Sequence, residues 1–142
     1  MKRYLNISIV YAILAMIGGV FYREFTKFND FEGVTVLSKI HTHLFILGMI
    51  VFLFVELFRR QADFTAKKMF QVFMIVYNLG VALTVIMMVV RGIFEVLGTS
   101  LSTGADAAIS GISGLGHIAT GIGLILFLLC IRNTDTTQSK NN

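Results

Sequence analysis

Long apolar runs alternate with short polar segments along this chain. Each run has roughly the 20 residues that a helix needs to cross the hydrocarbon core of a bilayer. The runs predict four membrane helices, at about residues 5–22, 36–58, 69–97 and 107–131. We therefore expect an all-α, integral membrane four-helix bundle over residues 1–132, followed by a polar, disordered tail at residues 133–142.

Composition narrows the class of protein further. The 142 residues are 56% hydrophobic and only 14% charged, whereas a soluble domain carries about 25% charged residues. The single cysteine excludes a disulfide framework or a thiolate metal site within one chain. The formal net charge of +4 lies mostly in the short connectors, and not in a basic stripe interleaved with aromatic residues. The lipid bilayer is therefore an expected partner, and nucleic acid is not.

The distribution of basic residues predicts the orientation in the membrane. They precede the first helix, fill the second connector and follow the fourth helix, at Lys2, Arg3, Arg59, Arg60, Lys67, Lys68, Arg132 and Lys140. The third connector, from Gly98 to Asp106, contains no lysine or arginine. Because basic connectors remain on the cytoplasmic side, we expect both termini to be cytoplasmic.

Two histidines stand near the start of the second apolar run, at His41 and His43. Imidazoles inside a membrane helix are costly, so they are functional candidates. Residues two apart on a helix point about 200° from each other. The two rings therefore address different clefts, or only one of them is functional. The alternative is a structural role, in which both rings form hydrogen bonds to neighbouring helices near the headgroup region.

The third histidine, His117, lies in the fourth run among serines and glycines. These small residues either make room for a planar cofactor with His117 as an axial ligand, or they allow close helix packing with His117 hydrogen-bonded across the interface. Gly48 lies on the His41 face of the second helix, where the missing side chain would let a flat ligand approach. The predicted topology places all three imidazoles in the outer half of the membrane.

Cationic side chains are expected at a similar depth. Arg91, at the outer end of the third helix, is a candidate for holding the carboxylates of a cofactor. Arg23 and Lys39 could serve in the same way. For Arg91 the alternative is a side chain that extends toward the interface and pairs with Glu95 one turn away.

The remaining chemistry is restricted by the motifs that the sequence lacks. It has no phosphate-binding loop, no HExxH or CxxC motif and no nucleophile elbow. Imidazole suits haem iron, copper and zinc. Two imidazoles with outer cations for propionates fit a b-type haem better than a bare metal, and the methionines are scattered rather than grouped near the histidines. The candidate metal ligands are His41, His43 and His117, with copper less favoured than haem iron.

Three segments carry a resemblance to known families. Ile40-His-Thr-His-Leu-Phe-Ile resembles the second-helix signature of haem-copper oxidases and their nitric oxide reductase relatives. His41-Thr-His43 followed by Gly48 also resembles the HxHEMxxG opening of NnrS-type haem proteins. From Phe21-Tyr-Arg-Glu-Phe through Val90-Arg-Gly to Gly114-Leu-Gly-His117, the chain resembles a family of short bacterial four-helix membrane proteins of unknown function.

The resemblance implies a specific assembly. The oxidase core consists of three four-helix arcs, and this chain looks like one arc, located in the bacterial cytoplasmic (inner) membrane. A homotrimer would rebuild the core, with His41 of one subunit and His43 of its neighbour on either side of each haem. The additional histidines of an oxidase-type copper site are not present in the sequence, so we do not expect a full oxidase.

The function expected from the sequence is that of a membrane b-type haem protein. Two axial imidazoles leave no open position on the iron, which favours electron transfer with a redox partner that the sequence does not identify. If only one ring is a ligand, binding or sensing of nitric oxide or oxygen at a five-coordinate haem becomes the better interpretation. The residues are also compatible with a copper- or zinc-binding protein, or with a non-catalytic membrane scaffold that has structural histidines.

Overall fold

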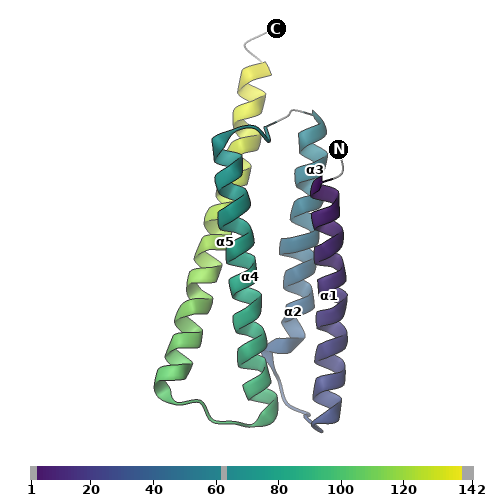
Figure 1. Ribbon diagram of the computed structural model, residues 1–142, viewed down its shortest axis with the longest axis vertical. Coiled ribbons are helices and arrows are strands. Elements are labelled where there is room, and N and C mark those ends of the chain that lie inside the picture. Colours follow the sequence, from purple (N-terminus) through teal and green to yellow (C-terminus); the bar gives the residue numbers. More distant parts are fainter. Residues whose placement is uncertain (1–2, 62–63, 139–142) are drawn as a thin grey trace.

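The computed structural model describes residues 3–61 and 64–138 and contains four long helices (Figure 1). The first is α1 (Arg3–Phe28). The second consists of four consecutive segments: η1 (Val36–Lys39), α2 (Ile40–His43), η2 (Leu44–Ile50) and α3 (Val51–Gln61), together called the second helix below. The third is α4 (Lys68–Leu97) and the fourth is α5 (Thr103–Gln138). All four are long and apolar enough to cross a membrane, which confirms the prediction of an all-α chain with four membrane helices.

Two helices extend past the ends expected from the sequence. The first helix continues six residues beyond Tyr22, and the Thr26 hydroxyl donates to the Tyr22 carbonyl within this extension. The fourth helix continues to Gln138, where the sequence suggests a disordered tail from Asn133. Polar residues without proline or glycine do not interrupt a helix that leaves the bilayer. The last part of the predicted tail, residues 139–142, lies outside the described residues.

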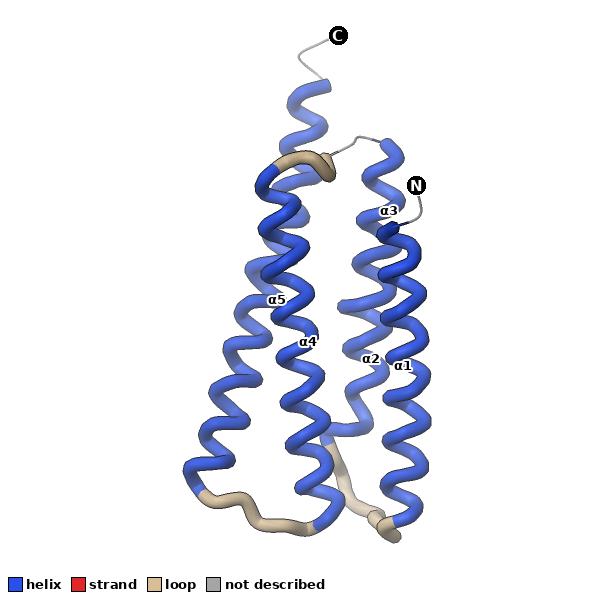
Figure 2. Tube along the Cα trace, in the orientation of Figure 1, coloured by secondary structure: helices blue, strands red, loops and turns tan. Residues whose placement is uncertain are grey.

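The helices form an open array in which each one packs against the next along the chain (Figure 2). The first and fourth helices lie at opposite sides of this array. The start of α1, the end of α5 and the connector between α3 and α4 share one end, here called the terminal end. The other two connectors share the opposite end, the loop end, toward which α5 diverges from α4.

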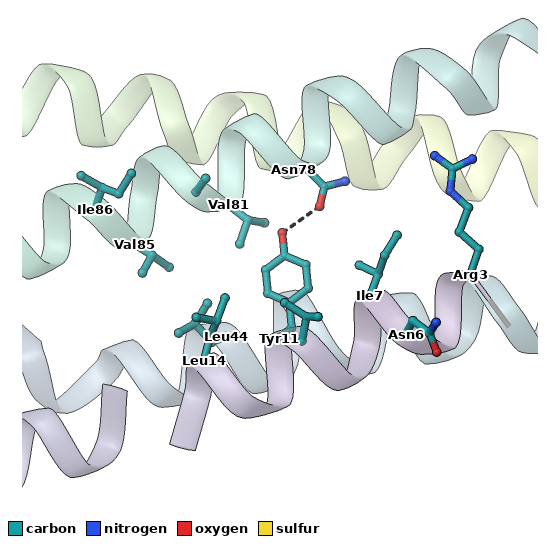
Figure 3. Close-up of a pocket in the computed structure, with 12 residues that line it drawn as sticks. Arg3, Asn6, Ile7, Tyr11, Leu14, Leu44, Asn78, Val81, Val85 and Ile86 are labelled. Atoms are coloured by element: carbon teal, nitrogen blue, oxygen red, sulfur yellow. Dashed lines mark hydrogen bonds between the residues drawn. The ribbon is translucent and has the colours of Figure 1, made fainter. Parts of the chain in front are cut away.

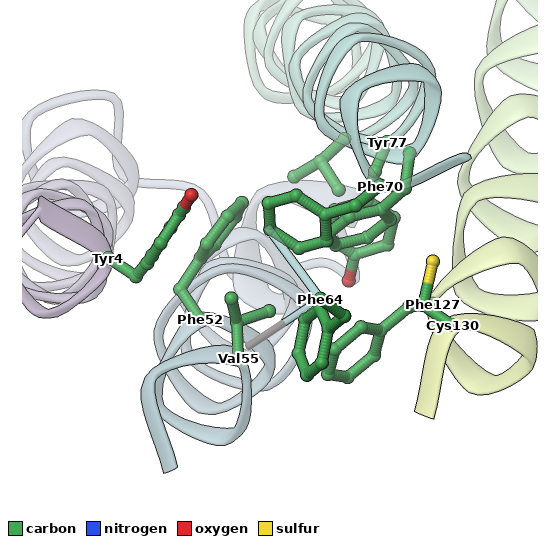
Figure 4. Packing of buried hydrophobic residues seen from close by; sticks show 10 residues of the cluster. Tyr4, Phe52, Val55, Phe64, Phe70, Tyr77, Phe127 and Cys130 are labelled. Carbon is green, nitrogen blue, oxygen red and sulfur yellow. The ribbon is translucent and has the colours of Figure 1, made fainter. Parts of the chain in front are cut away.

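An aromatic cluster joins the helices near the terminal end (Figure 4). Phe73 of α4 stacks on Phe127 of α5 with ring centroids 5.2 Å apart. Phe64, in the connector, is fully buried and packs against Phe70. The second core cluster lies toward the loop end and contains only residues of α1, the second helix and α4: Ala15, Leu37, Ile40, Leu44, Met88 and Val96. The first half of α5, which begins at Thr103, therefore contributes no buried residue to either cluster.

Glycines bring α4 and α5 into backbone contact along their middle part. A Cβ atom on Gly80 would lie 2.5 Å from the Thr120 nitrogen, and one on Gly116 would lie 2.6 Å from the Thr84 hydroxyl oxygen. Gly123 is packed in the same way against Tyr77. Small residues permit such contacts between membrane helices. This packing sets the rotation of α5 about its axis and thereby the direction of its other side chains.

Glu56 of α3 is a buried carboxylate with two basic partners. Its Oε1 atom lies 2.8 Å from an Arg59 nitrogen and 3.2 Å from the Arg60 Nε atom. Only 3% of Glu56 is exposed. Removal of a charged partner from a buried hydrogen-bonded pair costs about 1.5–3 kcal/mol.

We therefore expect Glu56→Gln to lower the free energy of unfolding by about 1.5–3 kcal/mol, measured by thermal unfolding of the detergent-solubilised protein. The matched control is Glu24→Gln, since the Arg23–Glu24 pair is 3.8 Å long and Arg23 is 79% exposed. Exposed pairs contribute roughly 0–1 kcal/mol. Equal losses in the two variants would show that the buried pair has no special role.

Candidate functional site

A cavity of about 520 Å³ lies between the second helix, α4 and α5, in the half of the array nearer the loop end. This histidine cavity is within the range of roughly 300–1,000 Å³ typical of small-molecule sites. Two of the predicted ligands and two of the predicted cations line it: His43, His117, Lys39 and Arg91. The rest of its wall is formed by Val36, Met87, Met88, Ile109, Ser110, Ser113 and Gly114.

The imidazoles of His43 and His117 lie close together in this cavity. Their ring centroids are 6.3 Å apart and their planes are perpendicular, at 89°. The Nδ1 atom of His43 lies 2.9 Å from the Lys39 carbonyl oxygen, and that of His117 lies 2.8 Å from the Ser113 carbonyl oxygen. Because a carbonyl oxygen only accepts hydrogen bonds, each Nδ1 carries the proton. In the neutral imidazole with this proton position, Nε2 carries the free lone pair, which is the tautomer that metal-ligating histidines adopt.

The distance between the rings suits a single metal ion between them. With metal–nitrogen bonds of about 2.0–2.1 Å, two imidazoles on opposite sides of one ion have centroids roughly 6 Å apart. Among the residues that the structure describes, no group of three or more His, Cys, Asp or Glu side chains gathers that would hold a bare ion. A haem needs only one or two axial ligands from the protein. The two histidines of this cavity match that number of ligands.

Arg91 lies at the edge of the histidine cavity and connects α4 to the first turns of α5. One of its guanidinium nitrogens donates to the Asp106 carboxylate at 2.8 Å and to the Ser110 hydroxyl at 2.6 Å. Arg91 pairs with Asp106 and not with Glu95 one turn away, and Glu95 instead accepts a hydrogen bond from the Val36 backbone nitrogen at 2.8 Å. Arg91 also borders a second, polar cavity of about 400 Å³ that leads to the loop end.

Asp106 is a residue of the site that the sequence analysis missed. It lies 15 residues from Arg91 along the chain, across the connector between α4 and α5. The available signal is its spacing from Ser110, because residues four apart share one face of a helix. Lys39 lines the cavity near the start of the second helix, as its place before His41 suggests.

His41 points to the other side of the second helix. It lines a smaller groove of about 250 Å³ together with Arg23, Gly19 and apolar side chains of α1. The separation of His41 and His43 into different clefts agrees with the angle of about 200° between them. His41 lacks the hydrogen bond to the carbonyl four residues earlier that both other histidines form. Its buried Nδ1 atom has no partner among the described residues.

The sequence of this chain matches a known protein family. Residues 1–134 match the model described as "Protein of unknown function (DUF2871)". The chain belongs to the DUF2871 family. No curated protein and no solved structure matches it. The expectation of a membrane protein family without a known function is thus confirmed, and the chemistry of this DUF2871 chain rests on its own residues.

Gly48 of this DUF2871 protein faces α1 and not an open cleft. A side chain there would collide with the ring of Tyr11, which packs directly on the glycine. Gly48 lies in the widened, π-helical segment η2, and the space beside it within the chain is filled by Tyr11 rather than left for a flat ligand.

The small residues around His117 divide into two groups. Gly116 and Gly123 are in close contact with α4. In contrast, a Cβ atom on Gly111, Gly114 or Gly121 would meet no other atom within 4 Å. Of these, Gly114 lines the histidine cavity. Helix packing therefore accounts for the first group, whereas the second group leaves open space along α5, which at Gly114 adjoins the histidine cavity. The hydrogen bond of the His117 ring is to Ser113 of its own helix.

Proposed function

We propose that this DUF2871 protein is an integral membrane b-type haem-binding protein, with His43 and His117 of one chain as the axial ligands. The observation that carries the proposal is that the two rings form the same hydrogen bond and lie close together. Each donates its Nδ1 proton to a carbonyl of its own helix, and the centroids are 6.3 Å apart in a shared cavity. A haem bound there supplies one-electron redox chemistry.

The other residues of the cavity have roles that follow from their charge and polarity. Arg91 and Lys39 would hold the haem carboxylates, as guanidinium and ammonium groups do in other sites. The side chains of Val36, Met87, Met88 and Ile109 would surround the ring with apolar atoms and exclude water. Ligation from both sides leaves no open position, which supports electron transfer rather than binding of a gas.

This arrangement changes one part of the expectation from the sequence. An imidazole nitrogen has a single lone pair, so His43 cannot serve a haem with His117 and another with His41. We keep the homotrimer as part of the proposal. Its support is the open array, together with the unpartnered Nδ1 atom of His41 near one side of it, where a neighbouring subunit would lie. The positive-inside rule supports a cytoplasmic terminal end in a bacterial inner membrane, with the haem in the outer half.

The test is the spectrum of the full chain purified in detergent from haem-replete cells. We expect one haem b per chain, and a sharp Soret band with a sharp α-band on reduction. A broad, high-spin spectrum would indicate that only one histidine is a ligand, and then binding of nitric oxide or oxygen would be the better function. A colourless protein would contradict the haem proposal. In that case, metal analysis would separate a copper or zinc protein from a scaffold.

A further inference from the structure

A further cavity lies on the opposite face of the array from the histidine cavity. It occupies about 770 Å³ between α1 and α4, with Leu44 of the second helix also lining it (Figure 3). We call it the tyrosine pocket. Its wall consists mainly of apolar side chains, at Ile7, Val10, Leu14, Leu44, Val81, Ala82, Val85 and Ile86. Neither the haem proposal nor the family description gives this pocket a role.

A polar pair crosses the middle of the tyrosine pocket. The Tyr11 hydroxyl of α1 donates to the Asn78 side-chain oxygen of α4 at 2.8 Å (Figure 3). The Asn78 amide donates one hydrogen to the Met74 carbonyl at 2.7 Å. A primary amide has two hydrogens and a phenol oxygen can also accept. Within the described part of the chain, the second amide hydrogen of Asn78 and the acceptor capacity of Tyr11 are unused.

The position of Tyr11 is fixed on both sides of its ring. The ring packs on Gly48 and stacks on Phe52, with centroids 5.6 Å apart and planes within 10°. Its hydroxyl is therefore presented to the pocket in a defined place. Unused hydrogen-bonding groups in apolar surroundings cost free energy, which a ligand with matching groups recovers.

The charge of the lining determines which ligand fits. Among the described residues, Arg3 is the one charged side chain that lines the pocket. It lies near Asn6 at the start of α1. Tyr11 is eight residues further along α1, which corresponds to about 12 Å of helix. A phospholipid keeps its charged headgroup at the membrane surface near Arg3. The deeper polar pair instead complements a neutral ring that carries hydrogen-bond acceptors.

We propose that the tyrosine pocket binds a membrane quinone. A ring carbonyl oxygen would accept the free amide hydrogen of Asn78, and the apolar tail would lie along the aliphatic wall. The proposal concerns binding alone, and it stands on residues that do not touch the histidine cavity. It can therefore be tested independently of the haem.

The experiment measures binding of decylubiquinone to the full-length protein in detergent, by equilibrium dialysis. Asn78→Leu removes the amide at similar volume, and Tyr11→Phe removes only the hydroxyl. We expect Asn78→Leu to weaken binding about tenfold, the loss of its one hydrogen bond to the ring. Tyr11→Phe removes the hydrogen bond that orients the Asn78 side chain, so we expect it to weaken binding by a smaller factor. Ala82→Phe should fill the pocket and abolish binding. The matched control is Ala108→Phe, at an exposed alanine of α5 that does not line the pocket.

Circular dichroism and thermal unfolding of each variant separate loss of binding from loss of fold. Wild-type protein that binds no quinone, or equal binding by wild type, Asn78→Leu and Ala82→Phe, would overturn the proposal. Phospholipid that remains through purification and is lost only in Ala82→Phe would also overturn it, because the pocket would then hold an acyl chain.

Discussion

We expect His43→Ala and His117→Ala each to lose the haem, and His41→Ala to keep it. The reason is geometric, since only His43 and His117 line a common cavity with both Nδ1 atoms bonded to carbonyl oxygens. Loss of a group that only hydrogen-bonds to a metal ligand reduces metal affinity roughly 10–100-fold. Loss of the ligand itself should therefore reduce haem affinity by at least that amount. The measurement is haem per chain in the purified variants, by the pyridine haemochrome method.

The His41→Ala variant makes this experiment a comparison between two ligand pairs, His43 with His117 of one chain and His41 with His43 of two subunits. If His41→Ala and His43→Ala lose the haem while His117→Ala keeps it, the ligands come from two subunits and the pairing within one chain is wrong. Added imidazole provides a second readout, because a free imidazole can enter the space left by His43→Ala. Recovery of the low-spin spectrum would separate loss of a ligand from general damage to the fold.

The second large effect concerns the contact between α4 and α5. Gly80→Ala places a methyl group 2.5 Å from the Thr120 nitrogen and 2.7 Å from the Thr120 hydroxyl oxygen. Backbone atoms cannot move aside as a flexible side chain does, so the two helices must separate. Overpacking of this kind costs typically about 1–3 kcal/mol. We expect a lower temperature of thermal unfolding in detergent, and reduced haem content because α5 carries His117.

The matched control for this contact is Gly121→Ala on α5. A Cβ atom there would meet nothing within 4 Å, and alanine is the better helix former. We expect its unfolding temperature to be unchanged or slightly higher. Equal behaviour of the two variants would show that the close approach of α4 and α5 does not contribute to stability.

The sequence predicted the features that depend on one helix at a time. Hydrophobic runs located the four helices because a bilayer imposes their length. Helical geometry placed His41 and His43 on different faces without any knowledge of the neighbouring helices. Arg91 and Lys39 were expected near the histidines from their depth alone, and the structure brings both to the histidine cavity.

The partner of each histidine could not be predicted in the same way. That His117 lies opposite His43 depends on how α5 is rotated, and the contacts of Gly80, Gly116 and Gly123 set that rotation. Those contacts need the positions of both helices. The Arg91–Asp106 pair likewise spans a connector, whereas the sequence suggested the nearer Glu95. Glu95 instead accepts a hydrogen bond from Val36 at the start of the second helix, and these two residues are 59 apart in the sequence.

The uneven placement of the buried clusters has a mechanical consequence. Near the terminal end, Phe127 and Cys130 anchor α5 in the aromatic cluster. Beyond the glycine contacts, the first turns of α5 are attached to α4 through Arg91, which bonds to Asp106 and Ser110. Partly exposed polar bonds of this kind contribute little to stability, so we expect the first turns of α5 to separate from α4 more readily than its second half does.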